Sequence, residues 1–214
     1  EWTKDHARMK AKLIGFITPQ QVTWTYPVDD QSVPAQYARA ISAYRANHVD
    51  EALKKIEALI QTEPHNPYFY ELKGQMLYDF GRAHSAIAPY TEAVRLAPNE
   101  PLIRLGSIQA RTEDPGATSA TLRDCIDELD QIRLAEPRNS RVLRLLGTLH
   151  GRLGHTGMAQ AWLAEEAFLQ ARYDESRQLA NGARLALPKD SPAAQRVADL
   201  IAQLDQVTAK KKRK

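Results

Sequence analysis

Apolar positions recur along much of this chain every three or four residues, which is the spacing of one face of an α-helix. The stretch EALKKIEALIQTEP, residues 51–64, shows this pattern and ends at a proline, and so does SAIAPYTEAVRLAP, residues 85–98. Four positions return 34 residues later: Ala52 as Ala86, Ile56 as Tyr90, Leu59 as Ala93 and Pro64 as Pro98. Few segments alternate apolar and polar residues, so the pattern predicts an all-α protein built from a repeated helical element.

A 34-residue period of paired helices is typical of the tetratricopeptide repeat, or TPR, in which each repeat is a helical hairpin. One hairpin cannot bury its apolar face alone, so successive hairpins stack into a solenoid. The second repeat, residues 67–100, carries Gly74 at a close helix crossing and Gly81 at the turn. We therefore expect a right-handed TPR solenoid of about four to five hairpins over residues 34–190.

The later repeats contain an insertion and end in a further helix. Pro137 follows Pro98 by 39 residues, and the extra residues fit the turn-rich segment RTEDPGATSAT, residues 111–121. A last helix over residues 191–208 begins with Ser191, a good N-cap residue, and a proline at the first helical position. We expect this helix to cap the open end of the solenoid.

The segment before the repeats, residues 1–33, is predicted to be a helix followed by an extended strap. Residues 1–17 read as a basic amphipathic helix. Its apolar side carries three residues: Met9, Leu13 and Phe16. The strap contains three prolines and shows no helical period until Ala35. Three residues are expected to hold the strap against the first hairpin: Trp24, Tyr26 and Pro27.

Charge excludes some partners of the folded body. The net charge is +3, but the five basic residues KKKRK at 210–214 leave the other 209 residues with 24 basic and 26 acidic side chains. The body therefore has no bulk charge that would attract nucleic acid, and we expect no specific nucleic-acid partner. Residues 209–214 are expected to form a disordered basic tail, with contact to nucleic acid or anionic lipid as the alternative. No apolar run approaches the roughly 18 residues of a membrane span.

The sequence contains no recognisable catalytic or metal-binding constellation. None of the six histidines belongs to an HExxH pattern. His150 and His155 are five residues apart, about 140° around a helix, so they are not expected to share a face. The single cysteine, Cys125, takes a small-residue position in a helix and is expected to be a core residue rather than a reactive thiol. We therefore predict that this chain is not an enzyme and holds no metal or cofactor.

The candidate binding surface is the concave groove that the first helices of TPR hairpins line. The predicted groove residues are Tyr37, Ile41, Tyr44, Arg45, Glu71, Gln75, Tyr78, Asp79, Arg111, Arg144, Thr148 and Arg152. The groove runs from aromatic residues to arginines, which suits a protein or peptide ligand with an apolar part and an acidic part. Two alternatives stay open: that some tyrosines pack against the N-terminal strap, and that arginines pair with neighbouring acids.

Three stretches carry a family resemblance. MKAKLIGFI (9–17) and TYPVDDQSVPAQYARAISAYR (25–45) resemble the segment that joins the catalytic domain to the TPR region in bacterial BepA-like zinc metallopeptidases. These are periplasmic relatives of the CAAX prenyl endopeptidases. The likeness extends through the repeats to LPKDSPAAQRVADLI (187–201), and so covers the C-terminal half of such a protein. The resemblance implies an upstream signal peptide, an upstream HExxH domain that holds zinc, and a periplasmic location. A start at Glu1 without methionine fits an excised or processed piece.

Together these patterns predict a non-catalytic protein-interaction domain, the regulatory or substrate-presenting part of a zinc metallopeptidase in the bacterial envelope. Its expected partner is a protein or peptide in the groove, and its own upstream catalytic domain is a second candidate. The alternative is a free-standing TPR adaptor that serves as a scaffold in an envelope assembly.

Overall fold

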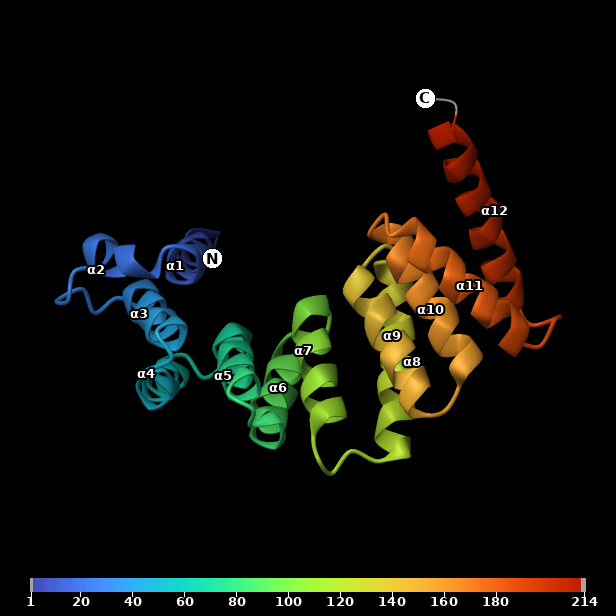
Figure 1. The fold of residues 1–214 in the computed structure, drawn as a ribbon. Helices are drawn as coiled ribbons and strands as arrows, with labels where there is room; N and C mark the ends of the chain where they lie inside the picture. Colours follow the sequence, from blue (N-terminus) through green and yellow to red (C-terminus); the bar gives the residue numbers. More distant parts are fainter. Residues whose placement is uncertain (1, 213–214) are drawn as a thin grey trace. The chain divides into compact units, whose positions relative to one another are not determined.

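The structure is a computed structural model that describes the backbone of residues 2–212 and the side chains of residues 3–209. Within that range the chain forms α-helices and one short 3-10 helix, and no strand occurs (Figure 1). The elements are α1 (Trp2–Ile17), η1 (Pro19–Gln21), α2 (Val22–Thr25), α3 (Val33–Arg45), α4 (Val49–Thr62), α5 (Pro67–Asp79), α6 (Ala83–Leu96), α7 (Pro101–Glu113), α8 (Ser119–Ala135), α9 (Ser140–Arg152), α10 (Thr156–Leu169), α11 (Tyr173–Ala186) and α12 (Pro192–Lys212). The all-α prediction is confirmed.

The helices fall into two compact units, residues 1–116 and residues 117–214. The division lies inside the predicted insertion at residues 111–121, so α7 belongs to the first unit and α8 to the second. Each unit has its own buried core.

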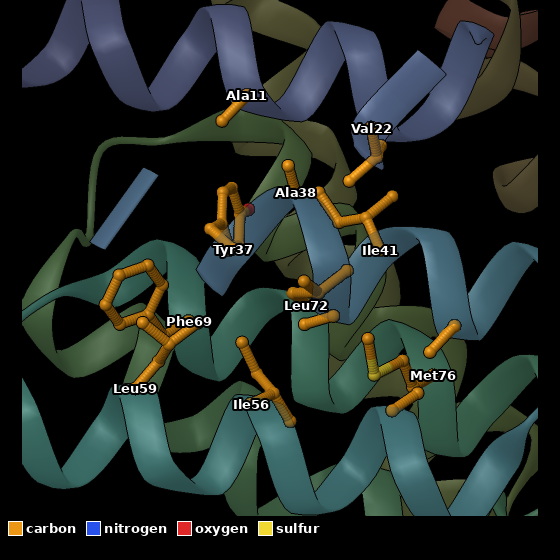
Figure 2. Close-up of a cluster of buried hydrophobic side chains, with 13 residues drawn as sticks. Ala11, Val22, Tyr37, Ala38, Ile41, Ile56, Leu59, Phe69, Leu72 and Met76 are labelled. Atoms are coloured by element: carbon orange, nitrogen blue, oxygen red, sulfur yellow. The ribbon is translucent and has the colours of Figure 1, made fainter. Parts of the chain in front are cut away.

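In the first unit, α3 pairs with α4 and α5 pairs with α6, as the repeat predicts. Helix α3 lies between α4 and α1, which packs along it (Figure 1). Figure 2 shows the resulting core, in which Tyr37 and Phe69 stack with ring centroids 5.2 Å apart. Ala11 of α1 lies on one side of this layer, and Ile56 of α4 lies on the other. The N-terminal helix is therefore part of the hydrophobic core.

The small residues of the repeat lie where helices approach closely. Ala52 and Ala86 are fully buried, as their repeat positions predict. The ring of Tyr90, on α6, fits between two glycines on neighbouring helices. A Cβ atom added to Gly74 of α5 would lie 2.7 Å from Tyr90 Cδ2, and one added to Gly106 of α7 would lie 2.6 Å from Tyr90 Cζ. The glycines thus make room for the ring that joins α5, α6 and α7.

Helix starts and turns follow local side-chain chemistry. Ser32 caps α3 by accepting a hydrogen bond from the backbone N–H of Ala35, and Asn66 caps α5 in the same manner. Gly81 has a φ of +72° at the turn between α5 and α6, a conformation that favours glycine. Asp50 lies in the first turn of α4, where its negative charge is favourable at the helix N-terminus.

The predicted extended strap is partly helical, because η1 and α2 occupy residues 19–25. The predicted anchoring role of Trp24 is wrong, since its side chain is 85% exposed. Tyr26 does pack against the core, as predicted. The guanidinium of Arg39, on α3, donates hydrogen bonds to the carbonyl oxygens of Pro27 and Asp30. These contacts with the main chain, and not packing of the Trp24 side chain, anchor the segment to α3.

In the second unit, α9 pairs with α10, α10 with α11, and α11 with α12. One stripe of α12, which includes Val197 and Leu204, is buried against α10 and α11. The sequence predicts an end at residue 208 for this helix, but α12 continues through residues 209–212, which were assigned to the disordered tail. Residues 213 and 214 lie outside the described residues. None of the helices within residues 2–212 combines the length and apolar character that a membrane crossing needs.

Candidate functional site

Helix α1 covers the first part of the predicted groove. Tyr37 and Ile41 have no exposed surface, so the prediction that they line an open groove is wrong. The physical reason is the close approach of α1 to α3, where a Cβ atom added to Gly15 would lie 2.8 Å from Ile41 Cβ. The N-terminal part of the chain does bury Tyr37, but helix α1 covers it, whereas the alternative left open by the sequence named the strap.

Long side chains of α1 also reach α5. The ammonium of Lys12 donates hydrogen bonds to both carboxylate oxygens of Glu71, at 3.1 and 3.3 Å. One turn earlier, the guanidinium carbon of Arg8 lies 3.5 Å from the ring centroid of Tyr68. Glu71, a predicted groove residue, therefore has a partner within the same chain.

Tyr44 and Asp79 form a second contact between hairpins. The Tyr44 hydroxyl donates a hydrogen bond to the Asp79 carboxylate, and its ring packs edge-on against Phe16 and Phe80. Burial, together with this hydrogen bond and the Asp79 charge, raises the pKa of Tyr44 well above its usual range. Tyr44, on α3, therefore connects this helix to α1 and α5. Its half-buried ring is less available to a ligand than predicted.

The remaining predicted residues of the first unit lie at its surface. Gln75 and Tyr78 of α5 and Arg111 of α7 are half-buried, and Arg45 of α3 is exposed. Beside them, α1 presents an apolar stripe that the sequence reading did not assign to binding. Met9, Leu13 and Ile17 are 48%, 51% and 70% exposed.

The apolar stripe of α1 is adjacent, around the helix, to the side chains with which α1 reaches Glu71 of α5 and Tyr44 of α3. Its residues are spaced at i, i+4 and i+8, so they share one helix face. At about 100° per residue, Met9 lies about 60° around α1 from Lys12, and Leu13 lies about 60° from Phe16. We call the set formed by the exposed Met9 and Leu13 of α1 and the half-buried Gln75 and Tyr78 of α5 the α1–α5 surface. The signal for it in the sequence was that α1 carries apolar residues on more than one face.

The three predicted residues of the second unit, Arg144, Thr148 and Arg152, share one face of α9. Arg144 Nη2 donates a 2.6 Å hydrogen bond to Glu166 Oε1. Glu166 is only 3% exposed and also accepts a hydrogen bond from the guanidinium of Arg172. The alternative in which arginines pair with neighbouring acids is therefore confirmed for Arg144. Arg152 is exposed on the same face.

His150 and His155 lie together, with 3.3 Å between their Nδ1 atoms. The predicted separation is wrong because His155 is not on α9: the chain turns at Gly154, which has a φ of +77°, and His155 precedes α10. Burial first, and then the neighbouring His155, lower the pKa of His150. Within the part of the chain that the structure describes, no three His, Cys, Asp or Glu residues form a metal-binding group. That the chain holds no metal stays a prediction.

Comparisons with known proteins identify the fold. The tetratricopeptide repeat family model matches residues 37–101. MamA from Desulfovibrio magneticus RS-1, residues 41 to the end, is 14% identical, with 83% of this chain and 96% of that chain covered at a TM-score of 0.61. YrrB, described as a TPR protein with an unusual peptide-binding site, is 13% identical, with 80% and 88% covered at a TM-score of 0.60. A MamA structure labelled MSR-1 C2 is 16% identical, with 79% and 95% covered at a TM-score of 0.60.

These similarities establish the TPR fold that the 34-residue period predicts. A search of curated protein sequences found no match. At identities of 13–16%, the similarity to solved structures supports the fold and does not assign a function.

Proposed function

We propose that this chain is a protein-interaction domain that binds a peptide segment of another protein on the α1–α5 surface. The observation that carries this proposal is the exposed apolar stripe Met9–Leu13–Ile17 on α1, the helix whose Lys12 reaches Glu71 of α5. A helix of a folded domain normally turns one apolar side inward and a polar side outward. Helix α1 buries Ala11 against α3 and yet leaves this second apolar row exposed.

The chemistry of the α1–α5 surface fits a segment with apolar anchors and a polar backbone. Met is flexible and adapts to different apolar side chains, and Tyr is frequent among residues that dominate binding energy. Gln75 and the Tyr78 hydroxyl supply hydrogen-bonding groups on the neighbouring helix. The description of YrrB as peptide-binding shows that a protein of this fold binds peptides, which supports the same class of ligand here.

We further propose that this domain is the C-terminal interaction part of a BepA-like zinc metallopeptidase in the bacterial periplasm. The resemblance of residues 9–17 and 25–45 to the joining segment of that family supports this. The zinc and the peptide-cleaving chemistry would then reside in an upstream domain, and this chain would present or restrict substrates. A free-standing TPR adaptor is the second candidate, and an HExxH helix encoded upstream distinguishes the first from it.

The binding proposal is tested with Leu13→Glu and a matched variant, Leu185→Glu. Both leucines are largely exposed on helices, but Leu185 is on α11 in the other unit. Peptides are selected from a displayed random library on the wild-type domain, and their affinities for the three proteins are measured by fluorescence anisotropy. We expect Leu13→Glu to weaken binding at least tenfold, because the charge would be desolvated in an apolar contact. Leu185→Glu should change binding less than twofold.

A selection that yields no specific binder, or binders equally sensitive to the two substitutions, would place the function elsewhere. Circular dichroism of the variants separates loss of binding from loss of folding. Because both side chains are largely in solvent, we expect helical content to stay unchanged in both.

A further inference from the structure

A second feature of the first unit lies apart from the α1–α5 surface, at the opposite end of α1. It is a cleft of about 790 Å³ between the first turns of α1, the start of α3 and the turn that joins α4 to α5. Sites for small ligands usually measure about 300–1,000 Å³. The cleft is therefore large enough for a small molecule or the end of a peptide.

Three helices begin at this cleft. Its lining includes Lys4 from the first turn of α1, Val33 from the first position of α3 and Pro67 from the first position of α5. A helix N-terminus carries about half a positive charge, so three of them together favour an anion. Side-chain caps at Ser32 and Asn66 already satisfy backbone amides of α3 and α5. Side chains are therefore the donors to consider first for direct hydrogen bonds to a ligand.

Arg8 lines the cleft without a carboxylate at hydrogen-bond distance. It is 8% exposed, and it is stacked on the ring of Tyr68. Its Nη1 atom is buried and makes no hydrogen bond of good geometry among the described residues, and its guanidinium also interacts with the buried hydroxyl of Tyr37. Its Nη2 atom lies 3.8 Å from Asp5 Oδ1, beyond hydrogen-bond length, and the Asp5 side chain is 66% exposed.

A buried guanidinium is costly when no close anion balances its charge, and for Arg8 the printed carboxylate contact is the long one with Asp5. Its planar fork matches the two oxygens of a carboxylate, and the stacking on Tyr68 fixes the plane of that fork. An incoming carboxylate would take the place of the long contact with Asp5. The arginine is thus positioned by the fold before any ligand arrives.

The charges and apolar side chains of the other lining residues determine which anion fits the cleft. Lys4 and Arg8 carry positive charge, whereas Asp5 and Glu63 carry negative charge. This balance suits a single negative charge better than the two of a phosphate. The apolar part of the lining comes from one set of residues: Ala7, Val33, Pro34, Pro64 and Pro67. Such a wall favours an apolar group attached to the carboxylate.

We propose that this cleft is a binding site for a carboxylate attached to an apolar group, with Arg8 as the residue that binds the carboxylate. Two sources present this chemistry: the C-terminus of a peptide that ends in an apolar residue, and a small apolar carboxylic acid. The site is separate from the α1–α5 surface, so it stands whether or not that surface binds peptides.

The test compares acids with their amides on the wild-type protein. Titration calorimetry is performed with N-acetyl-leucine, N-acetyl-leucinamide, a tetrapeptide ending in leucine, its C-terminal amide, and inorganic phosphate. We expect each acid to bind at least ten times more tightly than its amide, and more tightly than phosphate. A tetrapeptide that binds at least tenfold more tightly than N-acetyl-leucine identifies peptide ends as the source, and equal affinities identify small acids.

Arg8→Met and the matched variant Lys12→Met then assign the site. Both residues are cations of α1, but Lys12 is paired with Glu71 and does not line the cleft. Arg8→Met should weaken acid binding at least tenfold, and Lys12→Met should change it less than twofold. In the absence of ligand, Arg8→Met should be as stable as the wild type or more stable, because it replaces an under-satisfied buried charge with an apolar side chain.

Equal binding of acid and amide, phosphate binding as tight as acid binding, or full acid binding by Arg8→Met would each overturn the proposal. If Arg8→Met does not fold, the wild type still decides the matter by NMR. The acid, and not the amide, should then shift the Nε–Hε signal of Arg8 and the amide signals of the first turns of α1, α3 and α5.

Discussion

A buried polar side chain needs hydrogen-bond partners, and Glu166 is an example in this fold. Glu166 is almost fully buried and receives hydrogen bonds from Arg144 on α9 and Arg172 before α11, so one carboxylate ties three segments together. The arginine side chains are 64% and 40% exposed, so solvent screens these ion pairs, and loss of one arginine leaves Glu166 paired with the other. Arg144, which the repeat pattern predicts to be a ligand contact, therefore also has a structural role.

His150 should make the second unit less stable at acidic pH. Its pKa is lowered by burial, then by His155 and Arg196, while Asp130 opposes the shift. The unfolded chain therefore binds more protons than the folded one as the pH falls through the ordinary histidine range, and the free energy of unfolding decreases with it. In His150→Gln this contribution disappears. Urea denaturation at pH 8 and pH 5.5 should show a smaller loss of stability on acidification in the variant than in the wild type.

The comparison at pH 8 is the control for His150→Gln, because the wild-type imidazole is then uncharged and any difference reflects packing alone. Denaturation midpoints of wild type and variant that fall in parallel between pH 8 and pH 5.5 would contradict the assignment.

Packing between helices depends on a few positions at which no larger side chain fits. Tyr90 is the clearest example, because its ring fills the space between Gly74 on α5 and Gly106 on α7. Protein interiors are packed at the density of organic crystals, so an added methyl group at such a place must displace something. The repeat works as a solenoid element because small and large residues alternate across this contact.

Gly106→Ala should destabilise the first unit, whereas Gly151→Ala should not destabilise the second. Alanine is the better helix former by about 1 kcal/mol. At Gly106 the new methyl group would overlap the buried Tyr90 ring, and overpacking typically costs about 1–3 kcal/mol. At Gly151 the nearest atom to the new Cβ would be Ala159 Cβ at 3.7 Å, an ordinary contact.

Thermal unfolding of the two glycine variants measures the contrast. We expect a lowered midpoint for Gly106→Ala and an unchanged or slightly raised one for Gly151→Ala. Two variants with the same midpoint would mean that Tyr90 shifts easily, and that the glycine is not required by packing.

The sequence predicted the helices and repeat phase well because both depend on local spacing. Ala52, Ala86 and Gly74 all lie at close contacts, as the 34-residue period requires. The placement of α1 was not predictable in the same way. Its period shows an amphipathic helix but not which surface it covers, so Tyr37 was assigned to an open groove that α1 in fact fills.

The missed contacts share a cause with that error. His150 and His155 come together through a left-handed turn, to which the helical angle between them does not apply. Arg8 reads as one of several cations on a basic helix, and only the tertiary packing shows that it is buried beside Tyr68 without a close carboxylate. Contacts made across a turn or between separate helices leave no helical period in the sequence.

The whole chain consists of two compact units, and the boundary coincides with a compositional signal. Residues 111–121 interrupt the 34-residue period and contain Asp-Pro-Gly. The division falls at Gly116, and Pro115 and Gly116 are exposed. Exposed connections between compact units are preferred sites of proteolysis. The insertion therefore separates two parts with their own cores.

Limited proteolysis should first cut this connection. With a low ratio of subtilisin, mass spectrometry should detect two products that meet near residue 116, and both should resist further digestion, because each retains its buried core. The exposed segment 27–31 offers a matched control, since Arg39 binds its main chain at Pro27 and Asp30. It should be cut more slowly in the wild type, and Arg39→Met should make it a second early site. A first cut inside a helix would contradict the boundary at Gly116, and an unchanged cleavage pattern in Arg39→Met would show that Arg39 does not protect the 27–31 segment.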